Sequence, residues 1–99
     1  MTQSFGLSRL VWSETGDRLY SFEQAAYFTQ TSIPLIEKCV ALGIIEPEGD
    51  MLHRQDLVRI VRVLRLRRDL GLNLAGAAMV LDMATEIAQL KAQLRALRQ

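Results

Sequence analysis

The residues that could perform chemistry in this 99-residue sequence are few and are not arranged for catalysis. The one histidine, His53, and the one cysteine, Cys39, provide too few ligands for a metal site of the usual kind and exclude an internal disulfide. No nucleophile stands near a base, no glycine-rich loop could cradle a phosphate, and no paired carboxylates suggest a cleft. We therefore expect a binding protein and not an enzyme, with no metal or cofactor.

These two residues also have simpler interpretations, which we favour. His53 falls at the start of a predicted helix, where a surface or capping role is the alternative to metal binding. Cys39 falls inside a predicted helix, where it serves as a small apolar residue unless its thiol is reactive.

Charge is distributed unevenly along the chain, although the formal net charge is only +1. Residues 1–50 carry three basic and seven acidic side chains, a net charge of −4. Residues 51–99 carry nine basic and four acidic side chains, a net charge of +5. An acidic first half and a basic second half indicate two surfaces with different partners.

Length and composition fit a single compact domain, with 49% apolar and 23% charged residues. No apolar run approaches the roughly 20 residues of a membrane span, and the N-terminal sequence lacks a secretory-signal pattern. We expect a cytoplasmic protein. Within the domain we expect an N-terminal arm or hairpin over 1–20, a helix-turn-helix, wing and third helix over 21–72, and a C-terminal helix over 73–99.

Helix-start signals predict two short helices in the first half of the chain. Ser21 and Gln24 have the spacing of a capping box. Ser32 precedes a second helix whose first turn contains Pro34, and Gly43 suits its left-handed end. Two short helices joined by a tight turn indicate a helix-turn-helix unit, so we expect a mainly all-α fold.

Turn residues flank this unit on both sides. Residues 14–17, between two short apolar runs, predict a small hairpin or an extended arm. Residues 46–50 contain proline and glycine and predict a loop or a short wing. We interpret Trp12, Tyr20 and Tyr27 as anchors of the N-terminal arm, because they are too scattered to form a base-stacking platform.

A long third helix is predicted from about His53 to Leu70, with Gly71 ending it. It carries two apolar faces, which indicates packing against two neighbours. The first face is Leu57, Ile60, Val61 and Leu64, and the second is Val63, Leu66 and Leu70.

The third helix also carries arginines that have two interpretations. Arg62, Arg65 and Arg68 fall on one side and could bind phosphate, whereas Arg59 and Arg67 point elsewhere. The alternative, which we favour, is a solvated face whose arginines pair with the neighbouring acids Asp56 and Asp69.

The C-terminal helix begins after Asn73 and carries an apolar stripe with spacings of 4, 3, 4 and 3 residues. About two heptads make a marginal helix without a partner surface, so we expect a homodimer through antiparallel pairing of this helix. The predicted dimer residues are Met83, Ile87, Leu90, Leu94 and Leu97.

This order of elements resembles the DNA-binding domain of MerR-type regulators, over residues 20–26, 31–36 and 42–47. That family usually has an Arg-Tyr-Tyr run in the second helix and basic residues in the wing. Here the run is Glu37-Lys38-Cys39, and the wing over 46–51 contains three acids. Because cations supply phosphate contacts, this reversal of charge disfavours DNA binding through these elements.

The rest of the chain is similar to one branch of that superfamily, the chaperone-modulator (CbpM) family. The matching segments are residues 63–74, then Gly76, Ala78 and Leu81, and then residues 87–91; the resemblance covers 18–97. The resemblance implies binding to the J-domain of a DnaJ-like co-chaperone (CbpA type) and inhibition of its action on DnaK. It also implies a lessening of that co-chaperone's binding to DNA.

Charge then suggests which residues would meet such a partner. J-domains of this type carry a basic helix, so an acidic surface would be complementary to it. The predicted partner-binding residues are the acids Glu37, Glu46, Glu48 and Asp50, with Ile33 and Leu35 as an apolar centre. The alternatives are a MerR-like DNA-binding regulator, which would use Arg62, Arg65 and Arg68, and another docking adaptor such as an anti-sigma factor.

Overall fold

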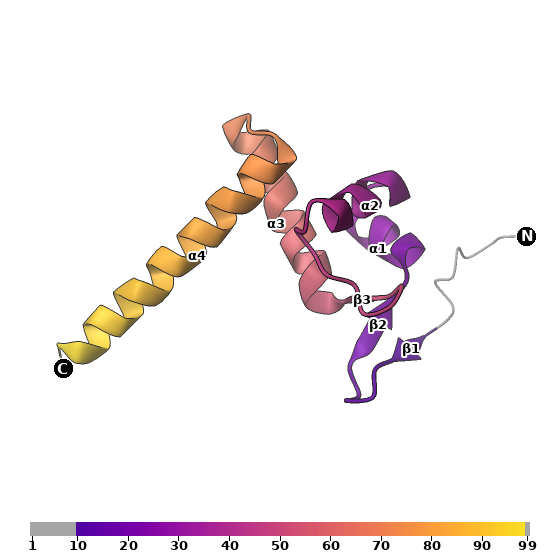
Figure 1. Ribbon diagram of the computed structural model, residues 1–99, viewed down its shortest axis with the longest axis horizontal. Coiled ribbons are helices and arrows are strands. Elements are labelled where there is room, and N and C mark those ends of the chain that lie inside the picture. The colour runs from indigo at the N-terminus through magenta and orange to yellow at the C-terminus, as the bar shows by residue number, and fades with distance from the viewer. Residues whose placement is uncertain (1–9, 99) are drawn as a thin grey trace, which may run out of the picture. The chain divides into compact units, whose positions relative to one another are not determined.

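The structure of the chain is a computed structural model that describes residues 10–98 (Figure 1). It is mainly helical, with four helices and three short strands in these residues, which confirms the predicted fold class. The chain forms two compact units, and the boundary between Val61 and Arg62 falls inside the third helix. Residues 1–9 of the predicted N-terminal arm lie outside the described residues.

The three strands form one antiparallel sheet in the first unit, in the order β1 (Val11–Trp12), β2 (Arg18–Tyr20) and β3 (Leu52–His53) (Figure 1). The predicted hairpin is the β1–β2 pair, whose turn is closed by Ser13 N donating to Asp17 O at 2.7 Å. Strand β3 was not predicted from the sequence, which indicates only a loop or wing there. It places the residues after the wing beside β2.

Two short helices follow the hairpin, α1 (Phe22–Thr29) and α2 (Ile33–Ala41). Both predicted N-caps are present: Ser21 Oγ accepts from Gln24 N at 3.0 Å, and Ser32 Oγ accepts from Leu35 N at 3.3 Å. At Ser21 the capping box is complete, because Gln24 Oε1 accepts from Ser21 N at 2.8 Å. Gly43 ends the second helix with a φ of 75°, as predicted.

The core of the first unit lies where α1, α2, β3 and the start of the third helix come together. Its largest fully buried apolar side chains are Ile36, Leu52 and Ile60, and Cys39 is fully buried as well. Cys39 therefore packs as the small apolar residue that the sequence predicts.

Helix α3 (Arg54–Leu70) begins just after His53, which ends β3 and is not the first helical residue. Asp56 Oδ2 accepts from His53 N at 2.9 Å, so the acid in the first turn satisfies a backbone donor at the helix start. The two predicted apolar faces are covered unequally: Ile60 and Val63 are fully buried, whereas Val61 and Leu70 are exposed.

Helix α4 (Leu74–Leu97) begins at the predicted cap, where Asn73 Oδ1 accepts from Gly76 N at 2.7 Å. Its first turns bury Leu74, Ala77 and Ala78, and every residue from 82 to 98 is exposed. No single helix within residues 10–98 is long and apolar enough to cross a membrane, although α3 and α4 pass that test as a bent pair.

Candidate protein-binding surface

The wing presents its acids on a tight turn in the first unit. Glu48 and Met51 form a bridge, with Glu48 N donating to Met51 O at 2.8 Å and Met51 N donating to Glu48 O at 3.1 Å. Gly49 supplies the positive φ of 66° that this turn needs. The structure therefore brings the exposed acids Glu48 and Asp50 onto one turn, two residues after the exposed Glu46.

One of these acids is held by an internal contact. Glu48 Oε1 lies 2.7 Å from Nε2 of His53, at the end of β3. His53 thus has the surface role predicted for it, and within the described residues it belongs to no group of three or more potential metal ligands.

The other predicted partner residues lie on α2. Glu37 is exposed, Ile33 is exposed at the first position of the helix, and Leu35 is half-buried. Glu37 lies inside α2, whereas the acids of the wing lie in the segment that follows this helix. The predicted residues therefore form two groups, one on α2 and one on the wing.

Four side chains form an aromatic patch that was not predicted from the sequence; we define it as Arg18, Tyr20, Tyr27 and Phe28. The Phe28 ring packs edge-to-face against Tyr20, with centroids 5.9 Å apart, and against Tyr27, with centroids 5.4 Å apart. The guanidinium carbon of Arg18 lies 4.5 Å from the Tyr20 centroid and 5.8 Å from that of Phe28. These contacts make a continuous surface from β2 to the end of α1.

Much of this patch faces solvent. Tyr27 is 60% exposed and Phe28 is 49% exposed. The sequence does contain a signal for this exposure, which is the adjacent pair Tyr27-Phe28. Adjacent residues of a helix point about 100° apart, so both rings are not expected to be buried against the same core. Tyr20 does connect the hairpin to α1, as expected of an anchor, whereas Trp12 is 58% exposed.

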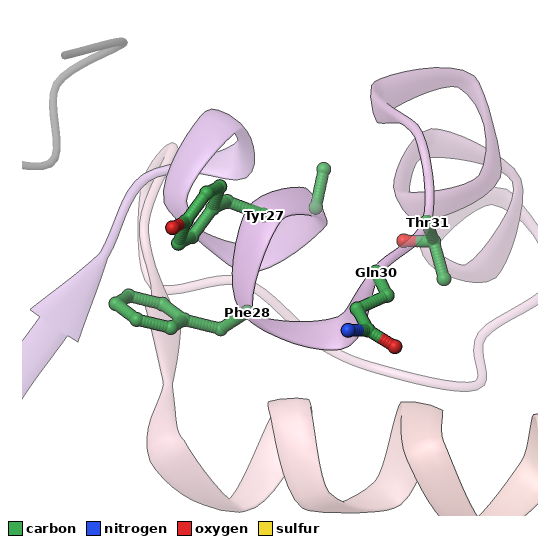
Figure 2. Close-up of a pocket in the computed structure, with 5 residues that line it drawn as sticks. Tyr27, Phe28, Gln30 and Thr31 are labelled. Atoms are coloured by element: carbon green, nitrogen blue, oxygen red, sulfur yellow. The ribbon is translucent and has the colours of Figure 1, made fainter.

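A shallow pocket adjoins the patch where α1 ends. Its walls are Ala26, Tyr27, Phe28, Gln30 and Thr31. Figure 2 shows the rings of Tyr27 and Phe28 on one side, with Gln30 and Thr31 on the segment that leads to α2. Gln30 has φ 58° and ψ 45°, a left-handed conformation that is unfavourable for a residue with a Cβ.

The arginines of the DNA-binding alternative lie on α3 in the second unit. Arg62, Arg65 and Arg68 are all exposed, and Arg68 Nε lies 3.7 Å from Asp69 Oδ1. Arg59 points elsewhere, as predicted, because its Nε donates to the main-chain oxygen of Ile44. Asp56, which the sequence suggests as a counter-ion for the arginines, accepts a hydrogen bond from His53 N.

The apolar stripe of α4 is uncovered in the described chain. Each of its five residues is more than half exposed; they are Met83, Ile87, Leu90, Leu94 and Leu97. A helix with such a stripe in water is only marginally stable alone, and most helical stability in proteins comes from packing of the apolar face.

Comparison with known proteins identifies the family. A family model described as "MerR HTH family regulatory protein" matches residues 21–99. Comparisons with curated proteins and with solved structures gave no match. The matched segment begins at the Ser21 cap and includes both short helices, the wing, α3 and α4. The chain therefore belongs to the MerR family of helix-turn-helix regulatory proteins.

Proposed function

We propose that this MerR-family chain is a chaperone-modulator adaptor, which binds the J-domain of a DnaJ-like co-chaperone (CbpA type) and inhibits its action on DnaK. The observation that carries this proposal is the wing, where Glu46, Glu48 and Asp50 are all exposed. A wing that read DNA would place cations there.

The sign of the charge decides between the two kinds of partner. Neutralising several phosphates with cations contributes orders of magnitude to DNA affinity, and carboxylates at those positions add repulsion. The same carboxylates attract a cationic protein face and accelerate its encounter with the wing. A basic helix of a J-domain is such a face.

The proposed interface also has an apolar component. Specific interfaces depend on a few buried aromatic and arginine side chains, and charged residues on the rim contribute less. The exposed Ile33 at the start of α2 lies two residues after Thr31, which lines the pocket. The chain therefore offers apolar and acidic groups on one helix-turn-helix module.

The test reverses the charge of the wing and measures J-domain affinity by calorimetry. The triple variant Glu46→Lys, Glu48→Lys, Asp50→Lys should bind the J-domain much more weakly and should no longer inhibit co-chaperone stimulation of the DnaK ATPase. Because Glu48 also contacts His53, the double variant Glu46→Lys, Asp50→Lys keeps that contact and should still lose affinity.

A matched control separates the wing from overall charge. The double variant Glu14→Lys, Asp69→Lys changes the net charge by the same amount as Glu46→Lys, Asp50→Lys, at exposed acids outside the proposed surface. It should retain affinity. Unchanged binding in both wing variants would remove this surface from the proposal.

The second candidate function is a DNA-binding regulator, which the exposed Arg62, Arg65 and Arg68 and the family match favour. Its signature is duplex-DNA binding whose affinity falls steeply with salt and depends on sequence. Replacing these three arginines by glutamine would reduce the salt slope if they contact phosphate. We expect the unaltered chain to show no such binding at physiological salt.

The adaptor acts as a homodimer in this proposal, and a second copy of α4 covers the exposed stripe. Antiparallel pairing lays the apolar stripe of one α4 along the same stripe of the other. Such a pair removes both stripes from water, and burial of apolar surface is the main stabilising term.

A further inference from the structure

We propose that the aromatic patch is a second contact point for the same partner, and that it receives a carboxylate side chain flanked by a large apolar side chain. This inference rests on the proposed function, because it describes how the partner bound by the acidic wing is also held at a second place. The partner surface must then combine a cationic face with a carboxylate.

The requirement for a carboxylate comes from Arg18. Its guanidinium lies over the rings of Tyr20 and Phe28, and its Nε is buried with no hydrogen-bond partner among residues 10–98. No carboxylate of these residues forms an ion pair with it. A partner's carboxylate would meet the terminal Nη groups of this guanidinium and not the covered Nε, and a charge-assisted hydrogen bond there is stronger than one between neutral groups.

The requirement for an apolar neighbour comes from the rings beside Arg18. Tyr27 and Phe28 are both about half exposed or more and are held edge-to-face, so little side-chain entropy is lost when a partner covers them. The pocket that they share with Gln30 and Thr31 gives an apolar side chain a place to enter (Figure 2). Contiguous exposed aromatic surface of this kind marks an interaction site, whereas isolated exposed apolar residues do not.

A polyanion fits this surface less well than one carboxylate does. Glu23 is exposed one turn before Tyr27 on α1, so an extended anionic strand that reached Arg18 would also meet a negative charge. A single side chain from a folded partner reaches Arg18 without that repulsion.

Two contacts of opposite sign have a consequence for specificity. The wing attracts positive groups and Arg18 attracts a negative group. Only a partner whose surface places both kinds of charge opposite these two sites makes both contacts at once. A uniformly basic protein or peptide satisfies the wing alone. The module therefore distinguishes its partner from other basic surfaces.

A double-mutant cycle with the purified J-domain tests this inference. Arg18→Met, which keeps the length of the side chain but removes its charge, should weaken binding by about ten- to a hundredfold. Each exposed carboxylate of the J-domain is neutralised in turn to its amide. One of these changes should weaken binding to the unaltered chain by a similar factor and have no further effect on Arg18→Met.

Two further pairs of variants separate binding from folding. Phe28→Ala should weaken binding, whereas Leu42→Ala, which removes a similarly exposed residue at the other end of the helix-turn-helix, should not. Arg54→Met is the charge control for Arg18→Met and should bind normally. Thermal unfolding of each variant shows whether the fold is retained.

The outcomes distinguish this inference from the proposed function. If the unaltered chain does not bind the J-domain, both are wrong. If binding is lost in Glu46→Lys, Asp50→Lys but unchanged in Arg18→Met and Phe28→Ala, the adaptor function stands and the second contact is wrong. A loss of affinity in Arg18→Met that couples to no carboxylate of the J-domain would also overturn it.

Discussion

Glu48 and His53 connect the two sides of the wing, with Oε1 of Glu48 lying 2.7 Å from Nε2 of His53. Glu48 begins the wing turn and His53 ends β3, so this contact holds the turn against the sheet. Glu48, which the sequence suggests only as a charged contact, therefore also stabilises the conformation of the wing.

Removing this contact should loosen the wing modestly. We expect Glu48→Ala to lower the free energy of unfolding by about 0.5–1.5 kcal/mol, the usual range for a partly exposed hydrogen bond. Urea denaturation followed by circular dichroism measures this change. Glu46→Ala is the control, and a loss as large in that variant would mean that the contact with His53 is not responsible.

The two serine caps should contribute unequally to stability. Ser21 takes part in a reciprocal, partly buried capping box, whereas Ser32 makes one exposed hydrogen bond of 3.3 Å. Ser21→Ala should therefore cost about 1–2 kcal/mol and Ser32→Ala about 0.5 kcal/mol, at the two ends of the range for such caps. Equal losses in denaturant titrations would contradict this ranking.

Gln30 should be replaceable by glycine with a gain in stability. Its left-handed backbone costs about 1–2 kcal/mol in a residue with a Cβ, and glycine avoids most of that cost. We expect Gln30→Gly to be more stable than Gln30→Ala by about 1 kcal/mol. The comparison of these two variants in thermal unfolding isolates the backbone, because both remove the side chain.

A polar substitution in the stripe of α4 should dissociate the proposed dimer. Leu90→Glu places a charge at the centre of the paired helices, so the chain should become monomeric in light scattering and lose helical signal from α4. Gln89→Glu adds the same charge on the adjacent exposed position and should remain dimeric. A monomeric unaltered chain would refute the pairing itself.

The direction of the pairing is open to a cross-linking experiment. With Ile87 and Leu94 at a positions and Leu90 at d, Ala84 and Lys91 both occupy e positions, which approach each other only in an antiparallel pair. The variant Ala84→Cys, Lys91→Cys should therefore form a dimer with a short bismaleimide. Efficient cross-linking of Glu86→Cys, Lys91→Cys instead would indicate parallel helices.

Local signals in the sequence predicted the helix boundaries well. The caps at Ser21, Ser32 and Asn73 and the glycine ends at Gly43 and Gly71 depend on contacts within four residues, so the residue types at those positions are sufficient. Strand β3 was missed because it has two residues, and its pairing with β2 joins segments more than 30 residues apart. A two-residue segment is too short to show the alternation of apolar and polar residues from which a strand is predicted.

The candidate surface was predicted in part. Its negative charge is visible in the sequence, since the acids at 46, 48 and 50 follow one another so closely. The aromatic patch was not predicted, because it depends on how β2 and α1 pack together. The sequence also does not show which of the two adjacent aromatic residues, Tyr27 or Phe28, the core buries. In the structure, neither Tyr27 nor Phe28 is buried.

The complete burial of Cys39 also makes the chain a reporter of its own motions. A thiol reagent reaches this side chain only when the helix-turn-helix opens, so the rate of modification measures how often the module opens in its native state. Ligand that binds only the closed module slows that reaction in proportion to its occupancy. The rate of this reaction at the single thiol therefore reports the opening of the recognition module without any substitution in the chain.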